Sequence, residues 1–196
     1  MIHQFRKSLQ HERAQVEKAD RIYREVLKAT EITRFNSDTD ADMLMQRQDI
    51  DLLLTIRGTT FKISEKFRDK DYGDLYIEVF SKYPHTKGWM HTGKPNAIIY
   101  FTPNSTYWIT HASLQECFEK NIIPTIPDSW YEELYQSKLS KCTKKVQLNG
   151  IETNIQLIQA HNFEGKAWDT IGFSIQFDVL SKLGVKFKKF KTIFYA

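Results

Sequence analysis

The stretch that decides the fold is QRQDIDLLLTIRGTTFKISEKFRDKDYGDLYIEVFS, residues 46–81. Apolar and polar residues alternate in three runs, at 49–56, 60–68 and 75–81, and two turn-forming segments, RGT and DKDYGD, separate them. Alternation with a period of two residues is typical of β-strands. The sequence therefore predicts a meander of three strands, each of which carries carboxylates in or beside its apolar pattern.

The composition is that of a folded protein, because 41% of the 196 residues are apolar and 27% are charged. The net charge of +4 permits an anionic partner without requiring one. Two cysteines, Cys117 and Cys142, are too few for a disulfide framework and too far apart for a zinc-binding pair. The histidines are scattered, which also speaks against zinc.

The first 15 residues, MIHQFRKSLQHERAQ, contain no apolar segment of signal-peptide length. No window approaches the ~18 consecutive apolar residues of a membrane-spanning helix. We therefore expect a cytoplasmic protein without a membrane partner.

The remaining patterns complete an α/β chain, which we expect to form a single domain over 1–196. Its core would cover about 5–110, and C-terminal helices and strands would follow over about 111–196. The stretch FNSDTDADMLMQRQ reads as a loop, and Asn149-Gly150 marks a hairpin turn. Helices are predicted at 5–31, 113–121, after Pro127 and at 177–183, and further strands at 96–103 and 106–111.

The second strand of the meander divides its residues between two faces. Phe61, Ile63, Glu65 and Phe67 share one face, while Lys62, Ser64, Lys66 and Arg68 share the other. The first and third strands contribute Asp51 and Glu78. If the three strands are neighbours in one sheet, Asp51 and Glu78 converge with Glu65 or Lys66.

Two or three carboxylates without cysteine or histidine form an oxygen-rich site, which suits Mg²⁺ or Mn²⁺. A lysine beside such a site can orient a water molecule and stabilise the charge that develops on a phosphate. Phosphodiester hydrolysis is the chemistry that this set would serve. The alternative interpretation is that these are solvated charges or ion pairs between strands.

Three segments carry a resemblance to a known family: MQRQDIDLLL, ISEKFRDKDYGDLYIEVFS and GWMHTGKPNAIIYFTP. Their order resembles the PD-(D/E)XK nuclease superfamily, and more narrowly a group of phage and mobile-element proteins assigned to it. The resemblance covers about residues 40–110. It implies a restriction-endonuclease-like three-layer core with a mixed central sheet, an elaborated C-terminal lobe, and magnesium-dependent cleavage of nucleic acid.

Carried onto this sequence, the resemblance makes Asp51 the first metal ligand, Lys66 the catalytic lysine and Glu78 a further acid of the site. The chain departs from the superfamily pattern at Ser64, where an acid is expected, while Glu65 lies directly beside Lys66. Either a bulge turns Glu65 into the site, or Glu78 supplies the missing carboxylate, or the site is degenerate. We rank Glu78 first.

The predicted function is thus a metal-dependent nuclease with Asp51, Glu65, Lys66 and Glu78 as catalytic residues, of which Asp51, Glu78 and Glu65 bind Mg²⁺ or Mn²⁺. DNA is favoured over RNA as the partner. The sequence does not decide the oligomeric state, and a homodimer is one alternative. The alternative is a catalytically inactive module that keeps the nuclease fold and binds nucleic acid or protein. The basic segment KFKKFK, residues 186–191, is either a backbone-binding surface or an edge strand guarded by lysines. Glu25 on the first helix is a further helper candidate.

Overall fold

The computed structural model describes the backbone of residues 2–3 and 5–191 and the side chains of residues 15–191. The described chain is an α/β protein with two six-stranded sheets. It separates into two compact units, and each of them is built from several segments of the sequence. The mixed-sheet unit comprises Lys7–Tyr72, Thr92–Ala112 and Phe187–Ala196, and the hairpin unit comprises Met1–Arg6, Gly73–His91 and Ser113–Lys186.

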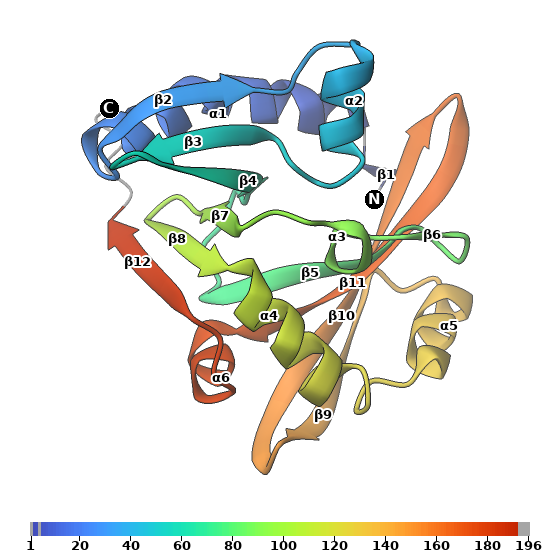
Figure 1. The fold of residues 1–196 in the computed structure, drawn as a ribbon. Coiled ribbons are helices and arrows are strands. Elements are labelled where there is room, and N and C mark those ends of the chain that lie inside the picture. The colour runs from blue at the N-terminus through green and yellow to red at the C-terminus, as the bar shows by residue number, and fades with distance from the viewer. Residues whose placement is uncertain (1, 4, 192–196) are drawn as a thin grey trace. The chain divides into compact units, whose positions relative to one another are not determined.

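The mixed-sheet unit has the strand order β12-β8-β7-β4-β3-β2 among its described residues (Figure 1). Strands β4 and β7 pair in parallel, and the other neighbours pair antiparallel. The strands are β2 (Ala29–Arg34), β3 (Leu52–Ile56), β4 (Thr59–Phe67), β7 (Ala97–Phe101), β8 (Ser105–Thr110) and β12 (Phe187–Lys191). Its helices are α1 (Phe5–Glu25) and α2 (Asp40–Gln46).

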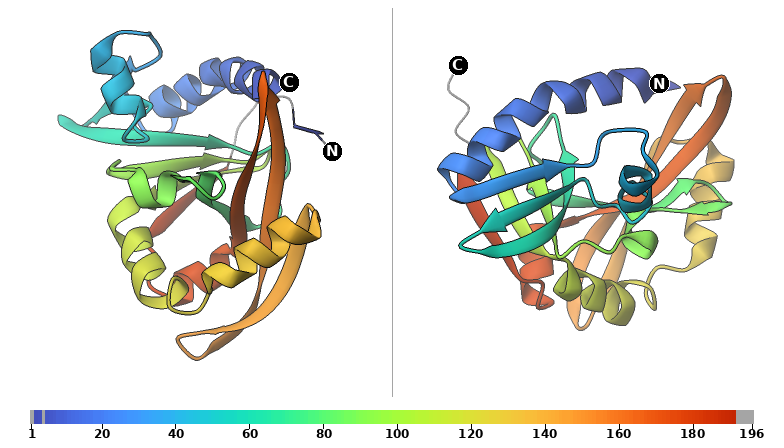
Figure 2. Two further views of the ribbon diagram at one scale, coloured as in Figure 1. Left: turned by 90° about the vertical axis from the view of Figure 1, so that its right-hand side faces the viewer. Right: turned by 45° about the horizontal axis from the view of Figure 1, so that its top comes forward.

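Helix α1 covers one face of this sheet, as Figure 2 shows. Ala19, Ile22 and Tyr23 on α1 are buried against strand residues that alternate along the sheet. Those strand residues are Leu52, Leu54, Ile63, Ala97, Ile99 and Phe101. The apolar stripe of α1 and the alternation of the strands together form this core, as the sequence patterns predicted.

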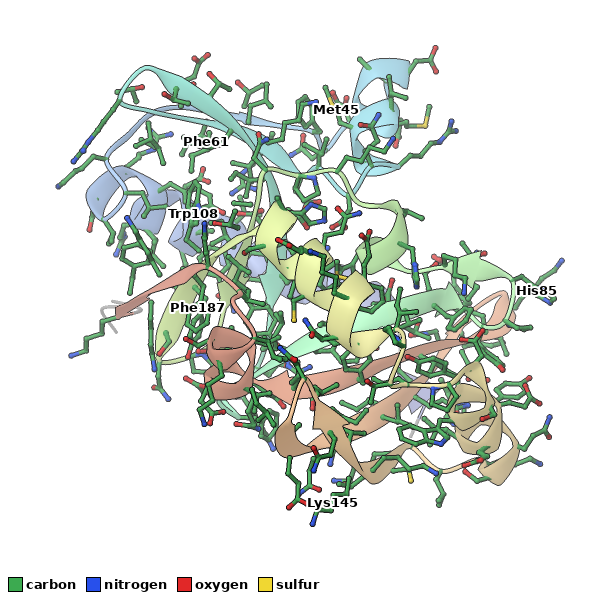
Figure 3. The ribbon with its side chains drawn as sticks, turned by 60° about the horizontal axis from the view of Figure 1, so that its bottom comes forward. Met45, Phe61, His85, Trp108, Lys145 and Phe187 are labelled. Carbon is green, nitrogen blue, oxygen red and sulfur yellow. The ribbon has the colours of Figure 1, made fainter. Side chains whose placement is uncertain are left out.

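Among the described strands, β12 lies at the edge of the mixed sheet and pairs with β8. The ring of Phe187 lies 6.1 Å from that of Tyr107, and Lys189 extends over the same tyrosine at 5.4 Å. Figure 3 labels Phe187 and also Phe61 and Trp108, whose rings meet edge to face at 5.3 Å. The segment KFKKFK is thus an edge strand, one of its two predicted interpretations.

The hairpin unit is built around the long antiparallel pair β10 (Ile151–Glu164) and β11 (Lys166–Gln176) (Figure 1). Strand β11 also pairs with β5, and β10 also pairs with β9. All pairs in this sheet are antiparallel except that of the two-residue β1. Its other strands are β1 (Ile2–His3), β5 (Asp74–Lys82), β6 (Thr86–Lys87) and β9 (Lys141–Leu148).

Short helices complete the hairpin unit and its junctions. They are α3 (Trp89–Thr92), α4 (His111–Cys117), the π-helical turn η1 (Phe118–Ile122), α5 (Asp128–Ser137) and α6 (Phe177–Lys182). Asn149 and Gly150 form the β9–β10 turn with positive φ angles of 47° and 80°, as the sequence predicted. Within the part of the chain that the structure describes, no helix combines the length and the apolar composition needed to cross a membrane.

The N-terminal helix ends earlier than predicted, at Glu25 rather than near residue 31. Lys28 adopts a positive φ of 58°, and the residues after it, which include the β-branched Thr30, Ile32 and Thr33, form β2. Part of the predicted loop is the helix α2, which begins where the Thr39 side chain accepts a hydrogen bond from the Asp42 N–H. Strand pairing therefore ends α1 earlier than predicted, and local capping starts the helix α2 within the predicted loop.

The larger correction concerns the three-strand meander. Strands β3 and β4 are neighbours, but β4 pairs next with β7, and β5 belongs to the other sheet. The expected boundary near residue 110 also does not match the two units, because Gly73–His91 joins the C-terminal strands. The premise that would bring Glu78 beside Lys66 within one sheet is therefore wrong.

Gly172 allows β11 to approach β5 closely at a register shift between Ile171 and Gly172. A Cβ atom there would overlap the carbonyl oxygen of Ile77 and lie 2.8 Å from the Tyr76 ring. We expect Gly172→Ala to lower the free energy of unfolding by about 3 kcal/mol, measured by urea denaturation. Gly58→Ala, in open space but at a φ of 77°, should cost only about 1 kcal/mol. Equal losses in the two variants would contradict this account.

Candidate active site

Two aspartates directly precede β3, in the segment Asp49-Ile50-Asp51. Ile50 is fully buried, and the residues on either side of it direct their carboxylates toward β4. Asp49 adopts a positive φ of 55° after the turn that follows α2. The N–H of Asp51 donates to the Ile63 carbonyl at 2.8 Å, which fixes its backbone beside β4.

Asp49 holds two side chains of β4. Its Oδ1 atom lies 2.6 Å from the Lys66 ammonium, and its Oδ2 atom accepts a 2.6 Å hydrogen bond from the Ser64 hydroxyl. Ser64 is fully buried, so this hydroxyl needs a partner, and Asp49 provides it. Asp49 thus places a carboxylate beside Ser64 and Lys66 on β4. Asp49 shares the strand alternation of Asp51 in the sequence, but it was not among the predicted site residues.

Asp51 is the acid whose ionisation the structure disfavours most clearly. Burial and the negative charges of Asp49 and Glu65 raise its pKa from 3.8 to about 6. The Lys66 ammonium and a 2.6 Å hydrogen bond from the Glu65 N–H oppose this rise. The carboxylate therefore lies where a nearby positive charge would relieve a considerable electrostatic penalty.

His111 adds a second buried polar group near Asp49. It follows β8 as the first residue of α4, and its N–H donates to the Asn96 carbonyl at 3.1 Å. Burial lowers the pKa of the imidazole, and the charge of Asp49 opposes that shift. Among the described residues, its buried Nε2 atom has no hydrogen-bond partner. In the sequence His111 is one of the scattered histidines, and no short-range spacing links it to β3.

Glu65 lies on the opposite face of β4, so its assignment as a metal ligand and catalytic residue is corrected. Its Oε2 atom lies 2.6 Å from Arg34 Nη1, and its Oε1 atom accepts a 2.6 Å hydrogen bond from the Tyr23 hydroxyl. Strands β4 and β7 pair in continuous register from Ile63 to Phe67, so the bulge at Glu65, one of the three alternatives, is not formed between them. Glu65 is a structural acid beneath α1.

Glu78 lies on β5 in the hairpin unit, opposite Gly172 of β11. Its part in the site stays a prediction. The helper candidate Glu25 lies on the exposed surface of α1, 4.0 Å from Arg21. Asp20 of α1 does contact the sheet, at 2.6 Å from Arg34.

Within the described part of the chain, no group of three or more His, Cys, Asp or Glu side chains is arranged to hold a metal ion. No family model matches the chain, and no curated protein or solved structure was found to be similar to it. The function is therefore inferred from the chemistry of the Asp49, Asp51, Ser64 and Lys66 cluster.

The raised pKa of Asp51 predicts a pH-dependent effect of Asp51→Asn. Since the folded-state pKa exceeds the unfolded one, the folded protein binds more protons between about pH 4 and 6, and stability falls as pH rises through this window. Asparagine lacks the charge and can still accept from the Glu65 N–H. We expect it to raise the free energy of unfolding by about 2–3 kcal/mol at pH 7 and by little at pH 4.

Urea denaturation in buffer without divalent cations measures this difference. Asp38→Asn is the matched control, because Asp38 is exposed, and it should change the free energy of unfolding by less than about 0.5 kcal/mol. An Asp51→Asn variant that gains nothing at pH 7, or gains as much at pH 4, would contradict the proposed burial of the charge.

Proposed function

We propose that the chain is a divalent-cation-dependent nuclease whose chemistry is carried by Asp49, Asp51 and Lys66. The observation that carries the proposal is their meeting where the chain enters β3 beside β4, with Lys66 2.6 Å from Asp49 and the half-buried Asp51 beside them. Two acids and a lysine serve phosphodiester hydrolysis by providing cation ligands and one positive charge for the phosphate. A purely structural ion pair would not require the second acid, Asp51, whose charge is disfavoured by burial.

The donor set fits Mg²⁺ or Mn²⁺. Both aspartates offer oxygen ligands, and Mg²⁺ in phosphate-processing sites is bound by one or two carboxylates together with water and substrate oxygens. Asp51 would hold the cation through the carboxylate that burial makes costly to ionise. Asp49 would be the second ligand. When bound, the cation would neutralise phosphate charge and lower the pKa of a coordinated water.

The side chains on β4 have separate roles in this proposal. Lys66, held by Asp49, would stabilise the negative charge that develops on the attacked phosphate. Ser64 would orient Asp49 through its hydroxyl, as a positioning residue. Glu78 stays the candidate for a third acid. A restriction-endonuclease-like fold and DNA as the favoured substrate belong to the same proposal.

A second candidate function is binding without cleavage, and one observation favours it. Both oxygens of Asp49 already have partners, Ser64 and Lys66, so the cluster is satisfied without a cation. A module of this kind would bind nucleic acid or protein and retain the cluster as a structural element.

Incubation of the full chain with labelled single-stranded DNA, duplex DNA and RNA tests the proposal, with Mg²⁺, Mn²⁺ or a chelator. We expect cleavage of DNA with a divalent cation, none with the chelator, and a loss of at least about 100-fold in Asp51→Asn. Mn²⁺ should raise the melting temperature of the wild type but not of Asp51→Asn. Binding of nucleic acid without cleavage under any of these conditions would favour the second candidate instead.

A further inference from the structure

A pocket of about 570 Å³ lies in the hairpin unit, where the end of β5 meets the paired ends of β10 and β11 beside α5. Its volume is in the range of small-molecule binding sites. The lining residues that decide its chemistry are Tyr83, Tyr135, His161, Phe163 and Asp169. None of them belongs to the proposed catalytic cluster, so the pocket needs an explanation of its own.

The register of β10 and β11 places an acid and an imidazole on one face of the hairpin. His161 and Asp169 lie directly opposite each other, and alternation along β10 adds Phe163 to their face. Trp168, the neighbour of Asp169, belongs to the opposite face by the same alternation. The Lys82 ammonium lies 5.3 Å from the centre of the Trp168 ring. This lysine charge is therefore directed away from the acid and the imidazole.

Helix α5 covers the face that carries His161 and Asp169. Asp169 and Ile171 alternate on β11, and Ile171 is paired with Phe80 of β5. The Phe80 ring lies 5.0 Å from that of Tyr83 and 5.7 Å from that of Tyr131 on α5. The aromatic residues of the pocket and its acid therefore lie on the same face of the sheet.

Aromatic rings form the wall of the pocket on this face. The rings of Tyr83 and Tyr135 lie 5.0 Å apart. Tyr135 is 36% exposed and Phe163 is 56% exposed, so both present ring surface to a ligand. The same aromatic cluster already holds one cation, because the Lys87 ammonium lies 4.1 Å from the centre of the Phe80 ring. Rings of this kind suit a further cation.

The charge on this face of the pocket is negative. The Asp169 carboxylate is paired through Oδ1 with His161 Nδ1, and it keeps its charge when the imidazole is neutral. Its Oδ2 atom has no hydrogen-bond partner among the described residues. Because Nδ1 then donates to the carboxylate, His161 Nε2 is an acceptor. Glu132 adds a second carboxylate, which accepts a 2.6 Å hydrogen bond from the Tyr83 hydroxyl.

Gln159 is an independent indication of a ligand on this face. It lies two positions before His161 on β10, so alternation places both residues on the same face. The residue is only 4% exposed, and its Oε1 atom has no hydrogen-bond partner in the part of the chain that the structure describes. A buried acceptor without a partner costs about 1–3 kcal/mol. A donor that enters from the His161 side would remove this cost.

We propose that this pocket binds a guanidinium group, the cation of an arginine side chain. Its planar fork carries five N–H donors and no acceptor, which matches the acceptor atoms of Asp169, His161 and Gln159. Its flat face would stack on the Tyr135 ring. A neutral ligand would leave the carboxylate without a counterion, and a phosphate would be repelled by it. The site is independent of the proposed cleavage, because binding uses no residue of the catalytic cluster.

Isothermal titration calorimetry of the full chain at pH 8 in EDTA tests this site, with N-acetylarginine amide as the probe. N-acetylcitrulline amide has nearly the same shape without the charge, and we expect it to bind at least about 10-fold more weakly. Asp169→Asn keeps an acceptor for His161 but removes the charge, and it should weaken binding of the arginine probe by a similar factor. Tyr135→Leu should weaken it about 5- to 30-fold.

Two variants are matched controls, and both should bind the arginine probe as the wild type does. Asp178→Asn removes an exposed carboxylate of the same unit, which lies 3.7 Å from Lys182. Tyr72→Leu removes a ring that is 57% exposed in the other unit. Tyr135 lies on the surface, so its variant should fold even if Asp169→Asn does not.

A pentapeptide with one central arginine distinguishes the source of the guanidinium. Binding of the peptide as tightly as the amide assigns the pocket to an arginine of a partner protein, and binding of the amide alone assigns it to a small molecule. No binding of either probe overturns the proposal, as does equal affinity for the citrulline amide or unchanged affinity in Tyr135→Leu. The measurement uses neither nucleic acid nor a divalent cation, so its failure leaves the nuclease proposal standing, and absence of cleavage leaves this site standing.

Discussion

Replacing Lys66 with alanine is expected to lower the rate of cation-dependent cleavage by about 100- to 1,000-fold. The substitution removes the positive charge that Asp49 holds at 2.6 Å beside Asp51. That charge would act mainly on the transition state, where the phosphate gains negative charge. Single-turnover assays with saturating protein should therefore show a lower rate constant, while the dissociation constant for DNA changes little.

Lys62→Ala is the matched control for Lys66→Ala. Lys62 lies on the same strand and in the same alternation, but its side chain is exposed and its strand contacts with Asn96 use backbone atoms of Lys62. It should retain the wild-type cleavage rate. Lys66→Arg keeps the charge and should recover part of the rate, which separates a chemical role from a structural one. Full activity in Lys66→Ala, with a folded protein confirmed by circular dichroism, would refute the proposed role of the lysine.

Alternation along single strands was the most reliable signal in the sequence. It predicted that Asp51 and Lys66 lie on neighbouring strands, and the structure has Asp51 directly before β3 and Lys66 on β4. It also predicted that strict alternation would turn Glu65 to the other face. The same alternation puts Asp49 on the face of Asp51, because the two residues are two positions apart. Asp49 was not selected because its contact with Ser64 depends on a turn with a positive φ before the strand.

Alternation along single strands does not predict which strands distant in sequence pair with each other. Strand β4 takes β7 as its parallel neighbour, and the segment between them contributes β5 and β6 to another sheet. Strand composition does not encode such a choice, because the apolar face of β5, with Leu75, Ile77 and Val79, fits any buried sheet. The role of Arg34 was equally hidden, since only the tertiary fold brings β2 and Glu65 together.

Replacing Arg34 with methionine is expected to lower the free energy of unfolding by about 3–5 kcal/mol. Arg34 is the cation between Glu65 and Asp20, at 2.6 Å from each, and the Glu65 side chain is only 5% exposed. Hydrogen bonds to both acids raise the pKa of the guanidinium, although burial opposes this. Methionine would fill similar space but leave the Glu65 charge buried without its cation. Urea denaturation followed by circular dichroism measures the loss.

Arg21→Met is the control, because the Arg21–Glu25 pair on α1 is 4.0 Å long and more than half exposed. Exposed pairs of this kind contribute at most about 1 kcal/mol. The double variant Arg34→Met with Glu65→Leu removes both charges and should regain most of the loss. If Glu65 were instead a cation ligand, Glu65→Gln would lose cleavage while remaining folded. We expect it to keep the wild-type cleavage rate at a temperature where it is folded, because its carboxylate faces α1 rather than Lys66.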